Sequence, residues 1–192
     1  MTPRRRRVVL ATSSALLSLV VCFAVFQAVR VRPQAATVLP AASSVLRTGS
    51  AAPLSFELTR LGGGSQVALA SLVKGRPAVL NFFASWCTAC AAELDAFGQV
   101  SRQYGDSVRF VGIDTNDTDH GLALQLLKKG GIGYPVGIDT ATSSVETAFG
   151  AVGLPSTFFL DRSGHVVAEV LGAESAAVLR GHIAALERAG SG

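Results

Sequence analysis

The pattern of apolar and polar positions divides the chain into three parts. Residues 8–29 are uncharged and rich in Leu, Val, Ala and Phe. As a helix this run would reach about 33 Å, enough for a hydrocarbon core about 30 Å thick. It therefore predicts a single transmembrane anchor, followed by an Ala/Ser/Pro-rich linker over 30–52 and one folded domain over 53–190.

Two continuous apolar runs mark the centre of the predicted domain. Residues 78–83 and 108–113 are expected to be buried strands, because a strand that is covered on both faces shows no alternation. Near the start of the domain, residues 56–58 and 67–69 flank three consecutive glycines, Gly62 to Gly64. This arrangement predicts an N-terminal β-hairpin.

Helical patterns alternate with the strand patterns. A helix is expected to begin at Cys87 and to run towards Tyr104. The remaining expected elements are helices over 121–129, 143–149 and 173–189, and strands over 134–138, 157–160 and 166–170. This order predicts an α/β fold with a mixed central sheet flanked by helices on both faces.

The net charge of +4 belongs to the N-terminal part of the chain rather than to the domain. Seven of the 17 Lys and Arg residues lie within 1–49, which contains no acid. Residues 50–192 contain the other ten Lys and Arg residues and all 13 Asp and Glu residues, so they carry a net charge of −3. Nucleic-acid binding needs Lys and Arg clustered on the domain, and this balance disfavours it.

The arginines also indicate an orientation in the membrane. Residues 1–7 form a basic N-terminus with four arginines, and fewer follow the apolar run closely. The positive-inside tendency then predicts a single-pass protein of the cell membrane, with its N-terminus inside and its domain extracytoplasmic. A signal peptide is the alternative interpretation of residues 8–29, since a basic start fits both.

Cys87 and Cys90 form a Cys-x-x-Cys pair at the expected start of a helix. Unpaired N–H groups and the helix dipole favour a thiolate there. We expect Cys87 to be exposed and to attack substrates, and Cys90 to be buried and to resolve the mixed disulfide. A structural disulfide is a second interpretation. Zinc is disfavoured, because the third cysteine, Cys22, lies in the apolar run.

Two stretches resemble the thioredoxin superfamily. Residues 81–90 (Asn-Phe-Phe-Ala-Ser-Trp-Cys-Thr-Ala-Cys) look like its active-site strand and helix start, and residues 152–161 look like its cis-proline loop. With the predicted anchor, Asn81 and Glu93, the chain is similar to TlpA/ResA-like thiol–disulfide oxidoreductases, which carry a redoxin (AhpC/TSA-type) domain. The resemblance implies a thioredoxin-like fold with an added N-terminal hairpin.

The resemblance also implies roles for individual residues. Pro155 would be cis, and Leu154 and Pro155 would dock the substrate chain against the cysteines. Trp86 would contact substrate, or merely cover the dithiol. Glu93 lies three residues after Cys90, on the same helix face, and would exchange a proton with it. The simpler interpretation is that Glu93 only balances the helix dipole.

By resemblance, the expected function is that of an extracytoplasmic reductant of protein disulfides, of the cytochrome c maturation type. Its substrates would include apocytochrome c, and a membrane electron donor of the thiol-transporter type would recharge it. No cofactor, metal or nucleic acid is expected. Many relatives have Pro where Ala89 stands here, so the opposite direction, a Dsb-like oxidase, is the alternative. A thiol peroxidase or a metal-binding module fits the Cys spacing less well.

Overall fold

The structure, a computed structural model, describes residues 49–140 and 142–189. The predicted basic N-terminus, the predicted anchor over 8–29 and most of the predicted linker lie outside these residues. Within the described part of the chain, no helix has both the length and the apolar character needed to cross a membrane.

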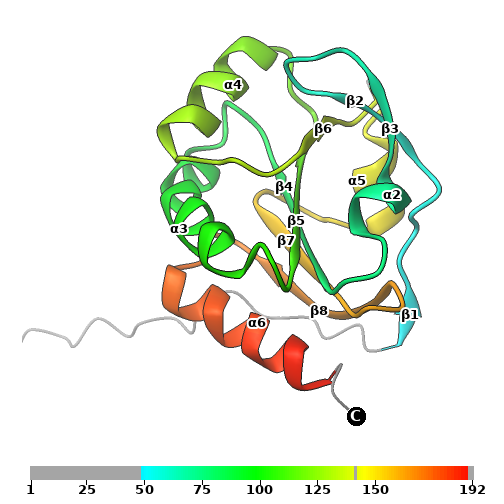
Figure 1. The fold of residues 1–192 in the computed structure, drawn as a ribbon. Coiled ribbons are helices and arrows are strands. Elements are labelled where there is room, and N and C mark those ends of the chain that lie inside the picture. Colours follow the sequence, from blue (N-terminus) through cyan, green and yellow to red (C-terminus); the bar gives the residue numbers. More distant parts are fainter. Residues whose placement is uncertain (1–48, 141, 190–192) are drawn as a thin grey trace, which may run out of the picture. The chain divides into compact units, whose positions relative to one another are not determined.

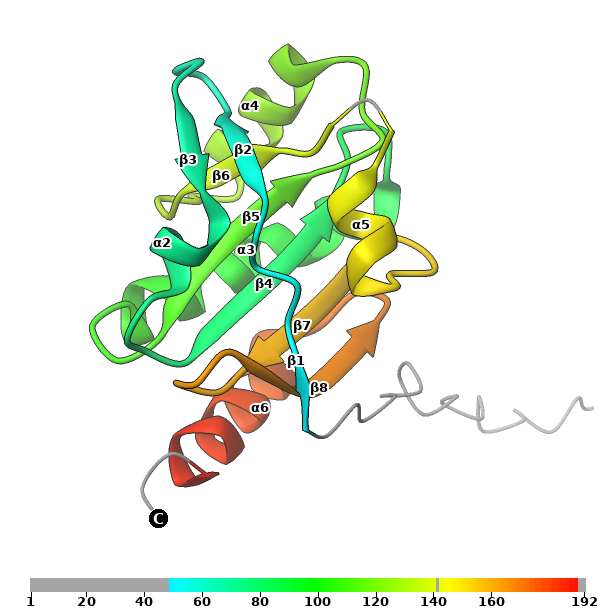
Figure 2. The ribbon, with the colours of Figure 1, turned by 90° about the vertical axis from the view of Figure 1, so that its right-hand side faces the viewer.

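Eight strands form a single sheet in the order β1-β8-β7-β4-β5-β6-β2-β3, which can be followed in Figure 2. The strands are β1 (Ser50–Ala51), β2 (Glu57–Arg60), β3 (Gln66–Ala68), β4 (Ala78–Phe83), β5 (Arg109–Asp114), β6 (Val136–Ile138), β7 (Ser156–Leu160) and β8 (His165–Leu171). β4 pairs in parallel with β5 and antiparallel with β7. The prediction of a mixed sheet is therefore confirmed.

The apolar run over 78–83 becomes the most buried strand. All six residues of β4 are buried, because helices cover both of its faces and strands flank both of its edges. Next to β6 lies the antiparallel pair β2–β3, with Leu58 opposite Val67. Strand β1 adds a short outer strand beside β8.

Helices cover both faces of the sheet (Figures 1 and 2). They are α2 (Leu69–Val73), α3 (Thr88–Tyr104), α4 (His120–Lys129), α5 (Ser144–Phe149) and α6 (Ala176–Ala189). Helices α2 and α5 pack on one face, where Phe149 lies 5.3 Å from Phe82 between ring centroids. Helices α3 and α6 pack on the other, through side chains that include Phe97 and Ile183.

Helix α2 was not predicted. We expected Leu69 to end a strand, but it begins this short helix. Leu69 and Val73 are one helical turn apart, and both are buried against the sheet. Tertiary burial of an i, i+4 pair therefore overrides a strand pattern that is only three residues long.

Close packing between α3 and α4 holds the first turns of α3 in place. A Cβ added to Gly98 of α3 would lie 2.1 Å from the carbonyl oxygen of Gly130, just after α4. A Cβ on Gly130 would in turn lie 2.6 Å from Cβ of Leu94. Only glycine permits this approach. Leu94 also belongs to the apolar cluster that contains both cysteines of the domain.

Candidate active site

The chain turns sharply between β4 and α3 and places Cys87 at the N-cap of the helix. The N–H of Cys87 donates to the carbonyl oxygen of Ala84 at 3.2 Å, which closes the turn. Cys87 has extended backbone angles, as an N-cap residue should, and its Sγ accepts the N–H of Cys90 at 3.1 Å. The sulfur atom of Cys87 therefore lies at the N-terminus of the helix, where the unpaired N–H groups favour a negative charge on the sulfur.

Cys87 and Cys90 are joined by a disulfide bond of 2.08 Å. Cys90 is fully buried, as we expected. Cys87 is less exposed than we expected, with only 6% of its surface accessible. The physical reason is that its sulfur is bonded to the buried Cys90 and packs in an apolar cluster, against which Leu154 is also packed.

The loop before β7 closes over the disulfide. The Leu154–Pro155 peptide bond is cis, as the resemblance implied. Leu154 packs against the cluster that contains both cysteines, and Pro155 is buried. The carbonyl oxygen of Pro155 accepts the N–H of Gly172 at 2.8 Å, which ties this loop to the end of β8. The structure thus brings two distant predicted site segments together.

Trp86 stands at the surface beside the disulfide, with 59% of its surface exposed. Its indole Nε1 donates to the carbonyl oxygen of Asn116 at 2.9 Å. Asn116 has a positive φ of 50°, a conformation that Asn tolerates better than most residues. The contact fixes one edge of the indole and leaves the rest of the ring accessible.

Asp117 holds the turn that precedes Cys87. Its carboxylate accepts the N–H of Ser85 and, at 2.9 Å, the Ser85 hydroxyl. Burial opposes its ionisation, but hydrogen bonds from the N–H groups of Asp119 and Ser85 outweigh burial and lower the pKa of Asp117. Asp119 caps α4 by accepting the N–H of Leu122 at 2.9 Å. The contact to Ser85 was missed, because nothing in the sequence relates residues 32 positions apart.

Glu93 lies in α3, three residues after Cys90, and is buried with 1% of its surface exposed. Its Oε1 accepts the side-chain N–H of Asn81 at 2.8 Å, and its Oε2 accepts the backbone N–H of Glu174 at 3.0 Å. Burial raises the pKa of Glu93 to about 7, and the two hydrogen bonds only partly oppose this shift. A carboxyl so placed is not a solvated group on the helix surface.

The residues around Glu93 form a polar network inside the domain. Asn81 also donates to the hydroxyl of Thr157 on β7 at 3.2 Å. Glu174, in the loop before α6, is 4% exposed, and burial followed by the charge of Glu93 raises its pKa to about 8. Sequence reasoning singled out Asn81 and Glu93 but missed Glu174, because a lone acid before a helix resembles an ordinary first-turn acid.

Asp114 is a further buried acid near this end of the sheet. Its Oδ2 lies 2.8 Å from Nδ1 of His120, at the start of α4. Burial raises the pKa of Asp114 to about 7, opposed first by the hydrogen bond to His120. Among residues 49–140 and 142–189, no group of three or more His, Cys, Asp or Glu side chains is placed to hold a metal ion.

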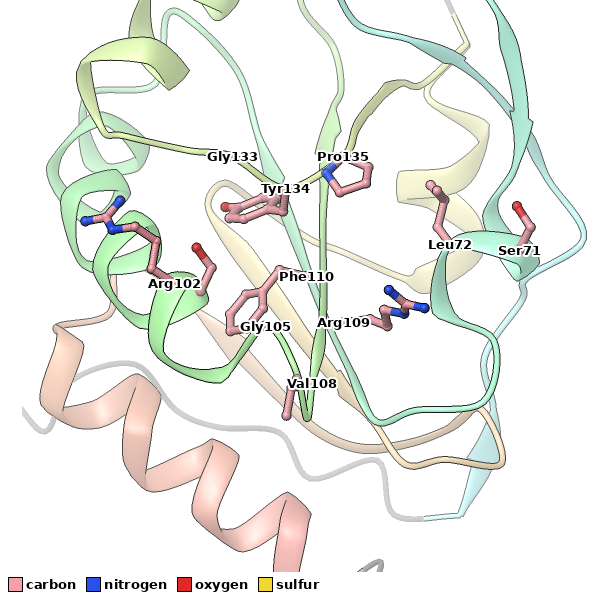
Figure 3. A pocket seen from close by; sticks show the side chains of 11 residues that line it. Ser71, Leu72, Arg102, Gly105, Val108, Arg109, Phe110, Gly133, Tyr134 and Pro135 are labelled. Carbon is pink, nitrogen blue, oxygen red and sulfur yellow. The ribbon is translucent and has the colours of Figure 1, made fainter.

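A cavity of about 440 Å³ lies at the opposite end of the central strands (Figure 3). It borders Arg109 at the start of β5, whereas the cysteines follow the other end of β4, the strand that runs parallel to β5. Figure 3 shows Arg102 on its α3 side and Arg109 on its α2 side, with the rings of Phe110 and Tyr134 between them. The cavity is therefore separate from the dithiol.

Comparison with known proteins agrees with this geometry. The AhpC/TSA family matches residues 48–169. The thiol–disulfide oxidoreductase ResA of Bacillus thuringiensis is 29% identical over 72% of this chain and 78% of its own length. The thiol:disulfide interchange protein DsbE of Escherichia coli is 33% identical over 48% of each chain.

A solved structure is also similar to this chain. It is the secreted disulfide oxidoreductase of Mycobacterium tuberculosis described as homologous to E. coli DsbE, and it is 31% identical with a TM-score of 0.62. The match covers 69% of this chain and 97% of that one. The chain therefore belongs to the AhpC/TSA family and is a thioredoxin-like homologue of the thiol–disulfide oxidoreductases ResA and DsbE.

Proposed function

We propose that this thiol–disulfide oxidoreductase reduces disulfide bonds of protein substrates outside the cytoplasm, with Cys87 as the attacking and Cys90 as the resolving cysteine. The observation that carries the assignment is the position of Cys87 Sγ. It accepts the N–H of Cys90 at the N-terminus of α3, so the helix stabilises a thiolate at Cys87. Cys90 is fully buried and is less able to reach a protein substrate first.

The reaction begins with the reduced dithiol. The Cys87 thiolate attacks one sulfur of the substrate disulfide, a Cys87–substrate bond forms, and the substrate's S–S bond breaks. The departing substrate sulfur takes a proton from water. Cys90 then attacks Cys87 as a thiolate and forms the disulfide present in the structure. The second substrate sulfur leaves and is protonated in turn.

Glu93 takes up the proton that Cys90 loses. Its pKa of about 7 means that near neutral pH a useful fraction is ionised and able to accept it. Burial keeps water away from this part of the site, since Glu93 and Cys90 are both almost completely inaccessible. A proton released there therefore needs an internal acceptor.

Trp86, Leu154 and Pro155 dock the substrate chain. Trp86 offers an exposed ring, held at one edge by Asn116. The Leu154–Pro155 loop packs beside the disulfide. A substrate segment would lie between the indole and this loop, with its sulfur next to Cys87.

The acids near the dithiol support the reductive direction. When ionised, Glu93 and Glu174 disfavour a thiolate nearby, and a dithiol that is less stable as thiolate gives up its electrons more readily. Apocytochrome c is the substrate implied by the resemblance, with a membrane thiol transporter as electron donor. The Cys87 N-cap acts in the opposite sense, because it stabilises the reduced form. That observation favours the alternative, a disulfide-forming oxidase.

Residues 8–29 would tether the domain to the membrane, and residues 30–52 would hold it away from the surface. Support comes from the charge pattern, with four arginines before the apolar run. The N-terminus would then lie inside and the dithiol outside the cytoplasm.

Mixed-disulfide trapping tests the roles of the two cysteines. A Cys90→Ser variant should accumulate covalent complexes with a disulfide-bonded protein substrate, visible on non-reducing gels, because nothing resolves them. A Cys87→Ser variant should form none and lose exchange. Cys22→Ser is the matched control and should exchange at the unsubstituted rate. Full turnover by Cys90→Ser would contradict the assignment.

A further inference from the structure

A second buried acid lies beside Glu93 and takes no part in the exchange described above. The backbone N–H of Glu174 donates to Oε2 of Glu93 at 3.0 Å, so the Glu174 side chain begins next to that carboxyl group. Within the described residues, neither carboxyl oxygen of Glu174 makes a well-formed hydrogen bond, although the Thr157 hydroxyl is close enough to lower its pKa. The structure thus holds a buried acid without a full set of partners.

His182 lies between this acid and the solvent. Its Nε2 is 3.7 Å from Oε2 of Glu174, and its ring stacks on Phe159 with centroids 4.8 Å apart. The Glu174 side chain is almost inaccessible, whereas 29% of the His182 side chain is exposed. Burial lowers the pKa of His182, so its ring is neutral and able to accept a proton.

Within residues 49–140 and 142–189, neither Glu93 nor Glu174 forms an ion pair with a lysine or arginine. Arg180 of α6 donates to Gln99 and Gln103 of α3 instead. The polar groups that face the two acids are Asn81 on β4, Thr157 on β7, the buried hydroxyl of Tyr134 and His182 on α6.

Two adjacent buried carboxyl groups without a cation cannot both ionise readily. Glu93 and Glu174 therefore hold one proton between them near neutral pH. A proton that moves from one carboxyl group to the other leaves the total charge of the pair unchanged, and the two groups titrate with shared apparent pKa values. Only Glu174 of the two has a neighbour that reaches the surface.

We propose that Glu174 and His182 carry the proton of Cys90 onward from Glu93 to solvent. This inference rests on the proposed role of Glu93. When Cys90 attacks Cys87, the Cys90 S–H proton passes to Glu93, the Cys87–Cys90 bond forms, and the substrate leaves as a thiolate. Glu93 passes the proton to Glu174, which passes one to His182, and His182 releases it to water. Both electrons go to the substrate, so the step balances.

The pH dependence of substrate release tests the role of Glu174. Single-turnover release from a preformed mixed disulfide should follow a midpoint near the pKa of Glu93, about 7. In Glu174→Gln the onward proton acceptor is gone, so release above this midpoint should become several-fold slower. Glu174→Asp keeps a carboxyl group and should retain part of the original rate. An unchanged release rate across the whole pH range in Glu174→Gln would overturn the proposal.

Chemical rescue tests His182. His182→Phe keeps an aromatic ring against Phe159 but removes the proton acceptor. Release should become several-fold slower in weak buffer, and added imidazole should restore it. His165→Phe is the matched control, because His165 is also partly exposed but faces Asp161. Slower release that imidazole does not restore would assign His182 a packing role only and overturn its place in the path.

The Glu93→Gln variant distinguishes the role of Glu93 in the proposed function from the role of Glu174 in the proton path. If Glu93→Gln leaves the pH profile unchanged, Glu93 exchanges no proton with Cys90 and the path loses its first step. If only Glu93→Gln alters the profile, the role of Glu93 stands and that of Glu174 is wrong. Carbon-13 NMR of labelled glutamate in the unsubstituted protein needs no variant. The two carboxyl carbons should titrate in coupled steps, and two independent curves would contradict a shared proton.

Discussion

Cys87 and Cys90 are three positions apart in the sequence, but their surroundings differ. Cys87 caps α3 next to the exposed Trp86 and keeps 6% of its surface accessible, whereas Cys90 is fully buried in the apolar cluster that contains both cysteines. The Cys-x-x-Cys spacing at a helix start predicted the burial of Cys90, but it did not predict that Cys87 would be almost as buried. The partners of Glu93 were beyond prediction, because Asn81 and Glu174 reach it across 12 and 81 positions. Only the fold shows that these segments converge.

Replacement of Glu93 by Gln should flatten the pH dependence of stability. Burial raises the pKa of Glu93 from 4.5 to about 7 in the folded protein. The folded state therefore holds a proton that the unfolded chain has lost, and the free energy of unfolding falls as pH rises from 4.5 towards 7. At about 1.4 kcal/mol per pKa unit, this loss is about 3 kcal/mol.

Urea unfolding at pH 5 and pH 8 measures the effect. Glu93→Gln should lose less stability between the two values than the unsubstituted protein does. Glu174 titrates over a neighbouring range, so part of the dependence should remain. An identical loss in both proteins would mean that Glu93 is ionised in the folded state at pH 5.

Replacement of Asp117 by Ala should slow thiol–disulfide exchange as well as lower the free energy of unfolding. Asp117→Ala leaves the Ser85 N–H and hydroxyl without their acceptor, at roughly 1–2 kcal/mol. The turn that presents Trp86 and Cys87 then loosens, and exchange should slow. Asp119→Ala is the matched control: it removes the α4 cap for about 1 kcal/mol but should leave the exchange rate unchanged. Equal rates in the two variants would contradict a positioning role for Asp117.

The continuous apolar runs predicted the central strands correctly, because burial on both faces of a strand leaves a clear pattern. Helix α3 was predicted from its start at the cysteines, and it begins at Thr88 with Cys87 as its cap. Short elements were less predictable. Helix α2 and strand β1 owe their conformations to contacts with the sheet rather than to their own sequences.

Two glycines in helix interiors should respond oppositely to alanine. Gly98→Ala would place a Cβ 2.1 Å from the carbonyl oxygen of Gly130 and force α3 and α4 apart, at roughly 1–3 kcal/mol. Gly181→Ala in α6 meets nothing within 4 Å and should stabilise the protein by about 0.5–1 kcal/mol through higher helix propensity. Thermal unfolding of both variants compares them. A Gly98→Ala variant as stable as Gly181→Ala would show that the α3–α4 contact yields readily.

Charge and hydropathy differ between the N-terminal part of the chain and the domain, and they predict a different function for each. The arginine-flanked apolar run is expected to bind a membrane, and the mildly acidic part of the chain carries the dithiol. Composition averaged over the chain conceals this division. Because the excess of basic residues ends near residue 50, the domain has no net positive charge, and nucleic acid is not an expected partner.

A shortened chain that begins at residue 49 should separate membrane binding from disulfide reduction. It lacks the apolar run, so it should stay in the aqueous phase when mixed with lipid vesicles, whereas the full chain should partition into them. Both should reduce a soluble protein disulfide at similar rates, because all site residues lie beyond residue 80. Vesicle binding by the shortened chain would contradict the proposed tether.

The reduction potential of the Cys87–Cys90 couple is the most direct test of the proposed reductant. It should be measured on the full chain by equilibration with a thiol buffer of known potential. We expect a value near that of thioredoxin, about −270 mV, because buried acids oppose thiolate formation. A value near that of DsbA, about −120 mV, would contradict it and establish the oxidase instead.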